Sequence, residues 1–172
     1  MPFIEMMHTY FRGEKLEAFG FILPVGILLL VYGITILKIE RSSLTFGIAI
    51  PTVLFGLVLI STGLGVGMRT PGQVADLKQR LEESPAQFIQ TELPRIEKVN
   101  VNFRRTYWAS GILGIIGLVF VYLIRTDWAH GLGAALILIC ALGLIVDGFA
   151  ERRAAHYTEA LKGLAEQHQT PP

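Results

Sequence analysis

The chain has 172 residues, of which 52% are hydrophobic and 17% charged, and its mean hydropathy is +0.51. A mean hydropathy this high, at so low a charge content, argues against an ordinary soluble domain and favours a protein that lies in lipid. The net charge of +1 gives no basis for a nucleic-acid partner. Cys140 is the single cysteine, which excludes an intrachain disulfide and a CxxC redox pair.

The first segment, 1–17, has the residue pattern of an amphipathic helix. Its apolar face carries Phe3, Ile4, Met7, Tyr10 and Phe11, and its polar face carries Glu5, His8, Thr9 and Arg12. Gly13 offers a hinge before the apolar run that follows. We therefore predict an interfacial amphipathic helix in the headgroup plane. An amphipathic lead-in without a function of its own is the alternative interpretation.

Four windows free of lysine, arginine and glutamate predict four transmembrane helices. They cover 18–37, 44–68, 106–124 and 129–147. His130 lies near the start of the last window and Asp147 ends it. At 1.5 Å per residue each window is about 28 to 37 Å long as a helix, which matches the roughly 30 Å hydrocarbon core of a bilayer. The windows are continuously apolar and lack the alternation of membrane-barrel strands, so the fold class is all-α.

Prolines and glycines in these windows predict how the spans pack. Pro24 and Pro51 each remove a backbone donor and are expected to kink their helices. Small residues allow helix backbones to approach closely in lipid, where hydrophobic drive between helices is weak. The glycines concerned are Gly56, Gly63, Gly65, Gly67, Gly111, Gly114, Gly117, Gly131, Gly133 and Gly143. They predict an integral membrane four-helix bundle, and they would equally serve a homo-oligomer.

The connection 69–105 and the tail 148–172 predict a small helical cap outside the membrane. Thr70-Pro71-Gly72-Gln73 and Ser84-Pro85-Ala86-Gln87 each have the pattern of a helix start, with a capping residue followed by proline at the first helical position. Pro94 is expected to begin or kink a third piece. In the tail, an apolar stripe continues the helical spacing of the fourth window.

The distribution of lysine and arginine predicts the orientation. Segments 1–17, 69–105 and the tail share one side and carry 12 of the 15 basic residues, whereas the two short turns carry 3. By the positive-inside rule, both termini, the connection and the cap lie in the cytosol.

Motifs for chemistry are missing, so the sequence predicts no catalytic, cofactor-binding or metal-binding residue. Charged residues near the membrane on the predicted cytosolic side form the one candidate site, an interaction cluster that would dock a protein or an anionic headgroup. The cluster comprises Arg12, Glu14, Lys15, Glu92, Arg95, Glu97, Arg104, Arg105 and Asp147. A solvated face with ordinary ion pairs is the alternative, and in that case Asp147 pairs with Arg104 or Arg105.

Two stretches carry a resemblance to known sequences. They are Tyr10-Phe11-Arg12-Gly13-Glu14-Lys15 and Glu92-Leu93-Pro94-Arg95-Ile96-Glu97-Lys98-Val99. With them the whole chain loosely resembles a group of small uncharacterised bacterial membrane proteins that share this four-span layout. The resemblance implies a bacterial inner membrane and implies no activity.

We therefore expect a non-enzymatic, multi-pass protein of the cell inner membrane that acts by interaction. An accessory subunit, a scaffold and an immunity-type protein all fit this description. Its partners would be the lipid bilayer and either another protein or further copies of itself. A small oligomeric transporter or channel is the alternative, and it would need several copies to build a pore. A membrane enzyme ranks third.

Overall fold

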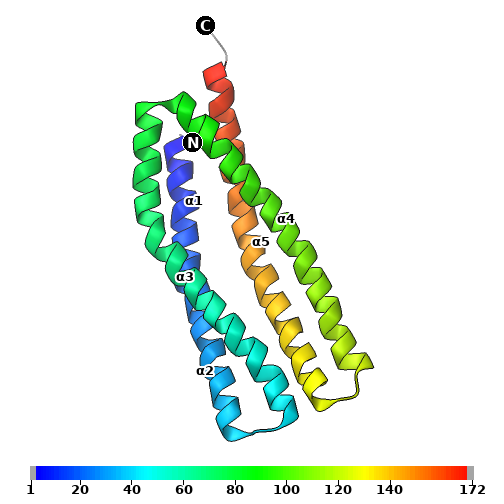
Figure 1. Cartoon of the computed structure of the whole chain (residues 1–172). Coiled ribbons are helices and arrows are strands. Elements are labelled where there is room, and N and C mark those ends of the chain that lie inside the picture. Colours follow the sequence, from blue (N-terminus) through cyan, green and yellow to red (C-terminus); the bar gives the residue numbers. More distant parts are fainter. Residues whose placement is uncertain (1–2, 170–172) are drawn as a thin grey trace.

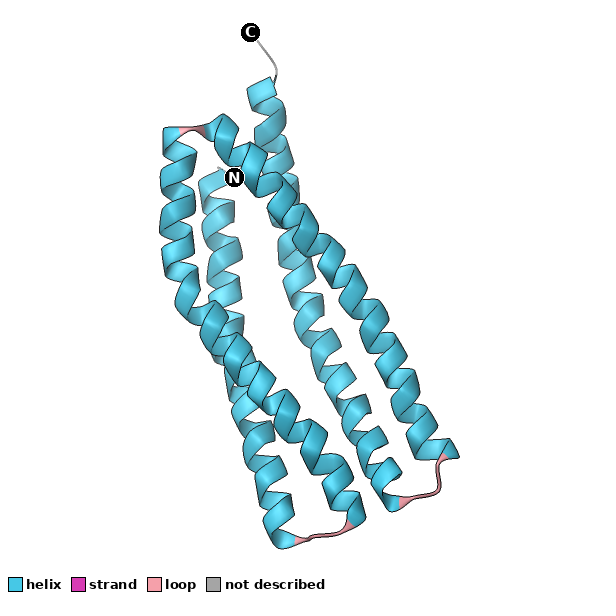
Figure 2. Cartoon of the chain, viewed as in Figure 1, coloured by secondary structure: helices cyan, strands magenta, loops and turns pink. Residues whose placement is uncertain are grey.

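The computed structural model describes residues 3–169, and almost all of them are helical. The elements are α1 (Phe3–Glu17), the π-helical turn η1 (Ala18–Ile22), α2 (Leu23–Ile39), α3 (Ser43–Glu83), α4 (Pro85–Leu123) and α5 (Asp127–Gln169). Within 3–169, residues 40–42, 84 and 124–126 are the only ones outside a helix, as the short pink loops of Figure 2 show. Residues 1–2 of the first predicted segment and 170–172 of the tail lie outside the described residues.

The prediction of an all-helical chain with four membrane-crossing helices is confirmed at the level of length and composition. α1, η1 and α2 run on as one helix, so the described chain forms four long helices of 37, 41, 39 and 42 residues, each apolar enough to cross a membrane. At 1.5 Å per residue each helix is about 55 to 63 Å long, roughly twice the thickness of a hydrocarbon core. Each helix therefore has an apolar half, formed by the windows defined above, and a polar half.

The polar halves all lie at the same end of the molecule. The turns 40–42 and 124–126 lie at the other end, while the N-terminal helix, the turn at Ser84 and the C-terminal end of α5 lie together (Figure 1). The fold is thus two long helical hairpins, one made of α1–η1–α2 with α3 and one made of α4 with α5. This arrangement places segments 3–17, 69–105 and 148–169 on one side, as the topology prediction requires.

The apolar halves lie in a row. α2 packs on α3, α3 packs on α5, and α5 packs on α4. α1 packs on both α3 and α5, so it fills the space between them in the polar half. The two outer helices, α2 and α4, therefore each rest against one neighbour, and α3 and α5 form the centre of the row.

Each contact in the row is made where two glycines face each other. The pairs are Gly26 with Gly56 between α2 and α3, Gly47 with Gly131 between α3 and α5, and Gly117 with Gly133 between α5 and α4. At both members of the first pair, an added Cβ would lie 2.9 Å from the carbonyl oxygen of the other glycine, inside normal contact distance. The backbones touch, as the glycine-rich spans predict.

The two halves have opposite interiors. In the apolar half the buried positions hold mainly glycine, alanine and threonine, while leucine, isoleucine and phenylalanine point outward. In the polar half a core of large side chains is buried between α1, α3, α4 and α5. Its members are Met7, Tyr10, Phe11, Leu77, Phe88, Ile89, Ile96, Ala154, Tyr157, Leu161 and Ala165. Most large apolar side chains that face outward thus lie in the apolar half, although Ile4 and Val101 are exposed in the polar half.

The N-terminal segment differs from the prediction. The prediction of a hinge at Gly13 is wrong, because α1 is helical from Phe3 to Glu17 and continues through η1 directly into α2. The apolar face with Met7, Tyr10 and Phe11 is buried in the core of the polar half. These three residues, which were expected to lie on a membrane surface, are covered by the chain's own helices, whereas Ile4 of the same predicted face is 40% exposed.

The helix starts in 69–105 were predicted correctly at one of two places. α4 begins at Pro85 after Ser84, although the Ser84 side chain makes no capping hydrogen bond. The start predicted at Thr70-Pro71 is wrong, because α3 continues through both residues and the Thr70 hydroxyl donates to the Val66 carbonyl at 2.6 Å. Pro94 likewise lies inside α4. Burial of Leu77 and Ile96 in the core holds these helices together against the local stop signals.

The disruption expected at Pro24 takes the form of a π-helical turn. Pro24 lacks an N–H and its ring crowds the carbonyl of Gly20, four residues earlier. In the turn, the Leu23 N–H donates to the Ala18 carbonyl, five residues back, which widens the helix. At Pro51, by contrast, α3 stays α-helical.

Candidate interaction site

The nine residues of the predicted interaction cluster do not converge on one site. Glu92 and Arg95 pair with each other, but two other acids pair with residues outside the cluster: Glu14 with Arg69 and Glu97 with Lys162. Within residues 3–169, the other five cluster members form no ion pair. The pairing of Asp147 with Arg104 or Arg105 was therefore wrong. Among the described residues the cluster thus divides into a buried network, a set of links between helices, four cations without an ion pair, and the unpaired acid Asp147.

The buried network is centred on Glu92 in α4. Its side chain is 2% exposed, and Arg95, one turn later, holds both oxygens: Nη2 donates to Oε1 at 2.6 Å and Nε donates to Oε2 at 2.7 Å. The Tyr157 hydroxyl of α5 donates to Oε1 at 2.9 Å. A buried carboxylate needs this bidentate partner, because an unpaired buried charge is strongly destabilising. Arg95 is 36% exposed, so the charge pair reaches the surface on one side.

Aromatic rings enclose this network. The Tyr10 ring of α1 stacks on Tyr157 with centroids 4.7 Å apart, and Phe3 and Phe11 pack against the same ring at 5.7 and 6.0 Å. Such ring pairs add to the free energy of burial. The network therefore joins α1, α4 and α5 in one packed unit.

The environment keeps both tyrosines of the network protonated. Burial, helped by the negative charge of Glu14, raises the pKa of Tyr10 to about 12. Burial also raises the pKa of Tyr157, and the neighbouring charge of Glu92 adds to this effect. Tyr157 thus acts as a permanent hydrogen-bond donor to Glu92. A tyrosine that acts as a general base would need the opposite shift of its pKa, so these two hydroxyls are suited to donating hydrogen bonds.

A second set of polar contacts fastens the helices together where the polar half begins. Glu17 of α1 pairs with Arg153 of α5, and Glu14 of α1 pairs with Arg69 of α3 at 3.4 Å. The Tyr107 hydroxyl of α4 donates to Glu151 of α5 at 2.7 Å. These contacts tie every helix of the polar half to a neighbour.

Gly13 has a role in one of these links. A Cβ at this position would lie 2.6 Å from Cδ of Arg153, so the absence of a side chain lets the arginine lie across α1 on its way to Glu17. Sequence analysis missed Glu17, Arg153, Tyr107 and Glu151. The one available signal was position, because Glu17 is the last charged residue before the first window.

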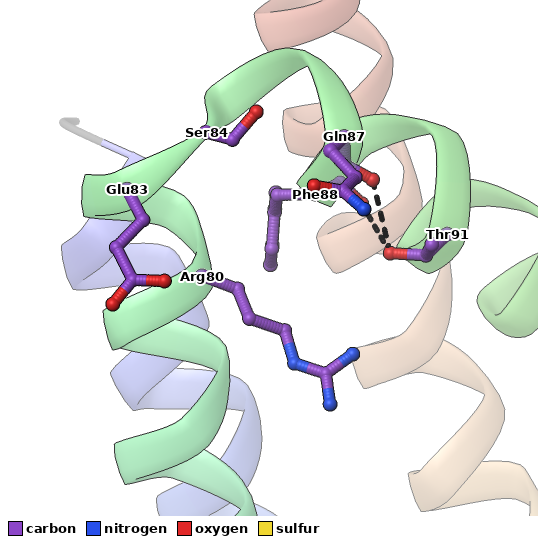
Figure 3. Close-up of a pocket in the computed structure, with 6 residues that line it drawn as sticks. All are labelled: Arg80, Glu83, Ser84, Gln87, Phe88 and Thr91. Atoms are coloured by element: carbon purple, nitrogen blue, oxygen red, sulfur yellow. Dashed lines mark hydrogen bonds between the residues drawn. The ribbon is translucent and has the colours of Figure 1, made fainter.

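A recess lies at the turn between α3 and α4 (Figure 3). Its lining residues are Arg80, Glu83, Ser84, Gln87, Phe88 and Thr91. Arg80 is engaged by Asp76 at 3.1 Å, and the Thr91 hydroxyl is bonded to the carbonyls of Gln87 and Phe88. The recess thus offers polar surface whose main groups already have partners.

Among residues 3–169, no three or more histidine, cysteine, aspartate or glutamate side chains come together in a way that would hold a metal ion. Cys140 is buried within the fourth apolar window.

The fold therefore defines a class, an all-helical protein with four helices long and apolar enough to cross a membrane, compatible with a multi-pass membrane protein. Comparisons of the chain with protein-family models, with curated proteins and with solved structures find no match.

Proposed function

We propose that the chain is a multi-pass protein of a bacterial inner membrane, with both termini in the cytosol, and that it works by binding a partner protein. In this proposal the polar half is a cytosolic helical cap, and the protein serves as an accessory subunit, a scaffold or an immunity-type protein. The 12 basic residues on the side of the polar half, against 3 on the side of the turns, support this orientation.

The observation that carries the proposal is how the polar half uses its charged and aromatic groups. Each of Glu92, Glu17 and Glu14 forms an ion pair with an arginine. Burial raises the pKa of Tyr10 and Tyr157, so both stay protonated. Groups engaged in this way hold helices in place, and such a rigid, filled core suits the presentation of a surface. The side chains left for a partner are those on the outside of the cap.

The outer face of α4 is the surface we favour for that partner. Val101 is 45% exposed, and Arg104 and Arg105 beside it are exposed and carry no counter-charge within residues 3–169. An apolar side chain flanked by free arginines fits the composition of protein interfaces, where arginine is enriched.

Site-specific photo-crosslinking in native membranes tests this proposal. A photoreactive amino acid at Val101 should capture one protein in stoichiometric yield, recovered by affinity purification of the chain. The matched control is Ile112 on the same helix, which is 58% exposed but lies in the apolar half, where lipid should surround the probe. Capture of further copies of the chain alone from position 101, or equal protein capture from both positions, contradicts the proposal.

The alternative function, a small oligomeric transporter or channel, makes a different demand on the structure. The apolar halves lie in a row, and four helices in a row enclose no lumen of their own. A conducting path would therefore lie between copies. A mass measurement of the protein in nanodiscs separates the two, because transport by this route requires an oligomer and the interaction proposal does not.

A further inference from the structure

A shallow groove runs along the outer face of the N-terminal helix where it passes from α1 into η1. Its lining residues are Arg12, Lys15, Leu16, Phe19 and Gly20. We propose that this groove binds one anionic phospholipid, with the two cations on its phosphate and the apolar residues along an acyl chain. The inference goes beyond the proposed function, since it concerns a ligand in the membrane and leaves the partner protein aside.

The charges at the groove are free because of how α1 faces its neighbours. The two acids nearest in sequence, Glu14 and Glu17, are turned toward α3 and α5, where Arg69 and Arg153 hold them. Arg12 and Lys15 lie exposed on the outer face and form no ion pair within residues 3–169. The outer face of α1 thus keeps two positive charges without a counter-ion.

The depth of the groove suits a lipid headgroup. Lys15 is the last cation before the uncharged window that starts at residue 18, so the two cations lie beside the end of the apolar half. Basic residues at this level attract anionic lipids. Leu16, 63% exposed, and Phe19, 38% exposed, follow on the side of the window, where an acyl chain would begin.

Two glycines shape the groove. The Phe19 ring rests against α3 where a side chain at Gly67 would otherwise be, so the ring is seated against the protein. Gly20 has no atom within 4 Å of the place its Cβ would take, which leaves the groove open toward the apolar half. The widened η1 turn lies at this point, and π-helical turns are frequent at functional sites.

Native mass spectrometry of the full chain in detergent tests the proposal. The probes are phosphatidylglycerol, phosphatidylcholine and inorganic phosphate. We expect one phosphatidylglycerol to be retained in preference to phosphatidylcholine. Each cation near an anionic surface contributes roughly a fivefold effect, so the variant Arg12→Gln/Lys15→Gln, which lacks both, should retain about 25-fold less phosphatidylglycerol, with phosphatidylcholine unchanged.

The matched control is Arg104→Gln/Arg105→Gln, which removes two exposed, unpaired cations at the same end of the apolar half but from α4. It should keep the preference for phosphatidylglycerol. Equal losses in both double variants mean that bulk charge alone attracts the lipid, and this result overturns the site. Displacement of the lipid by millimolar inorganic phosphate also overturns it, because an acyl chain would then add nothing.

A second variant keeps both charges and fills the groove. Gly20→Leu places a side chain in open space, so the fold should tolerate it. The proposal expects phosphatidylglycerol retention to fall several-fold with an unchanged unfolding temperature. Full retention in this variant shows that the groove takes no part in binding and overturns the inference.

Discussion

Replacing Gly56 with alanine tests the close packing of α2 against α3. The new Cβ would lie 2.9 Å from the Gly26 carbonyl oxygen and 2.9 Å from the Leu30 nitrogen. Carbon and oxygen are ordinarily about 3.3 to 3.6 Å apart in such contacts, so the helices must separate by roughly 0.5 Å. A gap of this size forfeits about a quarter of the dispersion energy of each contact across the interface.

We expect Gly56→Ala to lower the free energy of unfolding by about 1–2 kcal/mol. Overpacking an interface destabilises a protein by about 1–3 kcal/mol. The higher helix propensity of alanine offsets up to about 1 kcal/mol of this loss. The assay is thermal unfolding of the purified chain in detergent, followed by circular dichroism. For a chain of this length, the midpoint should fall by about 2 to 8 °C.

Gly65→Ala is the matched control, because Gly65 lies in the same helix and has no atom within 4 Å of its Cβ position. It should leave the midpoint unchanged or raise it. The double variant Gly26→Ala/Gly56→Ala should cost less than the sum of the two single variants, because one separation of the helices accommodates both methyl groups. Equal shifts for Gly56→Ala and Gly65→Ala would refute the packing argument.

Three further predictions concern the polar half and the topology. Glu92→Ala should lower the free energy of unfolding by about 3 kcal/mol, and Glu92→Gln should lower it by less. The value is at the lower end for a broken buried ion pair because Arg95 is partly exposed and can be hydrated. The measurement is denaturant titration, and equal stability of both variants and the parent would contradict this prediction. Burial raises the pKa of Tyr10 above its unfolded value of 10.0 to about 12, so the folded state holds the proton more tightly. The contribution of Tyr10 to the free energy of unfolding is therefore fully present below pH 10, and about 2–3 kcal/mol of it is lost as the pH rises toward 12. When the free energy of unfolding is measured against pH, the variant Tyr10→Phe should lose less stability over this range. Cysteines introduced at the exposed positions Glu83 and Arg41 should react with a membrane-impermeant maleimide from the cytosolic and the outer side, respectively, and the reverse pattern would invert the topology.

The four long apolar helices could be predicted from the sequence because a single physical rule governs segments that are able to cross a membrane. A charged side chain in the hydrocarbon core is costly, so windows such as 44–68 are cleared of charge whatever the tertiary structure is. The helix boundaries outside those windows follow a weaker rule. Thr70-Pro71 has every local sign of a helix start, but the burial of Leu77 in the core outweighs it and α3 continues.

The glycine contacts show where sequence information ends. Gly56 and Gly65 lie in the same span and look alike in sequence, yet one faces Gly26 and the other faces open space. Which glycine meets which depends on the register of two helices, and this is a property of the folded pair. The composition predicted that such contacts exist without identifying their partners.

The candidate site was predictable only within single helices. Glu92 and Arg95 are three residues apart, a spacing that places them side by side on one helix face. Tyr157, which completes the network, lies 65 residues away in sequence, and nothing local connects it to Glu92. Glu14 was likewise predicted to belong to the cluster, but its partner Arg69 comes from α3 and was not among the predicted residues.

The opposite interiors of the two halves imply that different forces hold them together. In a bilayer, burying a leucine between helices gains little, and contact between backbones at Gly26 and Gly56 is what remains. In water, burying Phe88, Tyr157 and their neighbours supplies hydrophobic free energy at about 25 cal/mol per Å² of apolar surface. Adding volume should therefore destabilise the apolar half, while removing volume should destabilise the polar half. Since α1 packs on both α3 and α5 in the polar half, the core there also holds the two hairpins side by side for the glycine contacts below it.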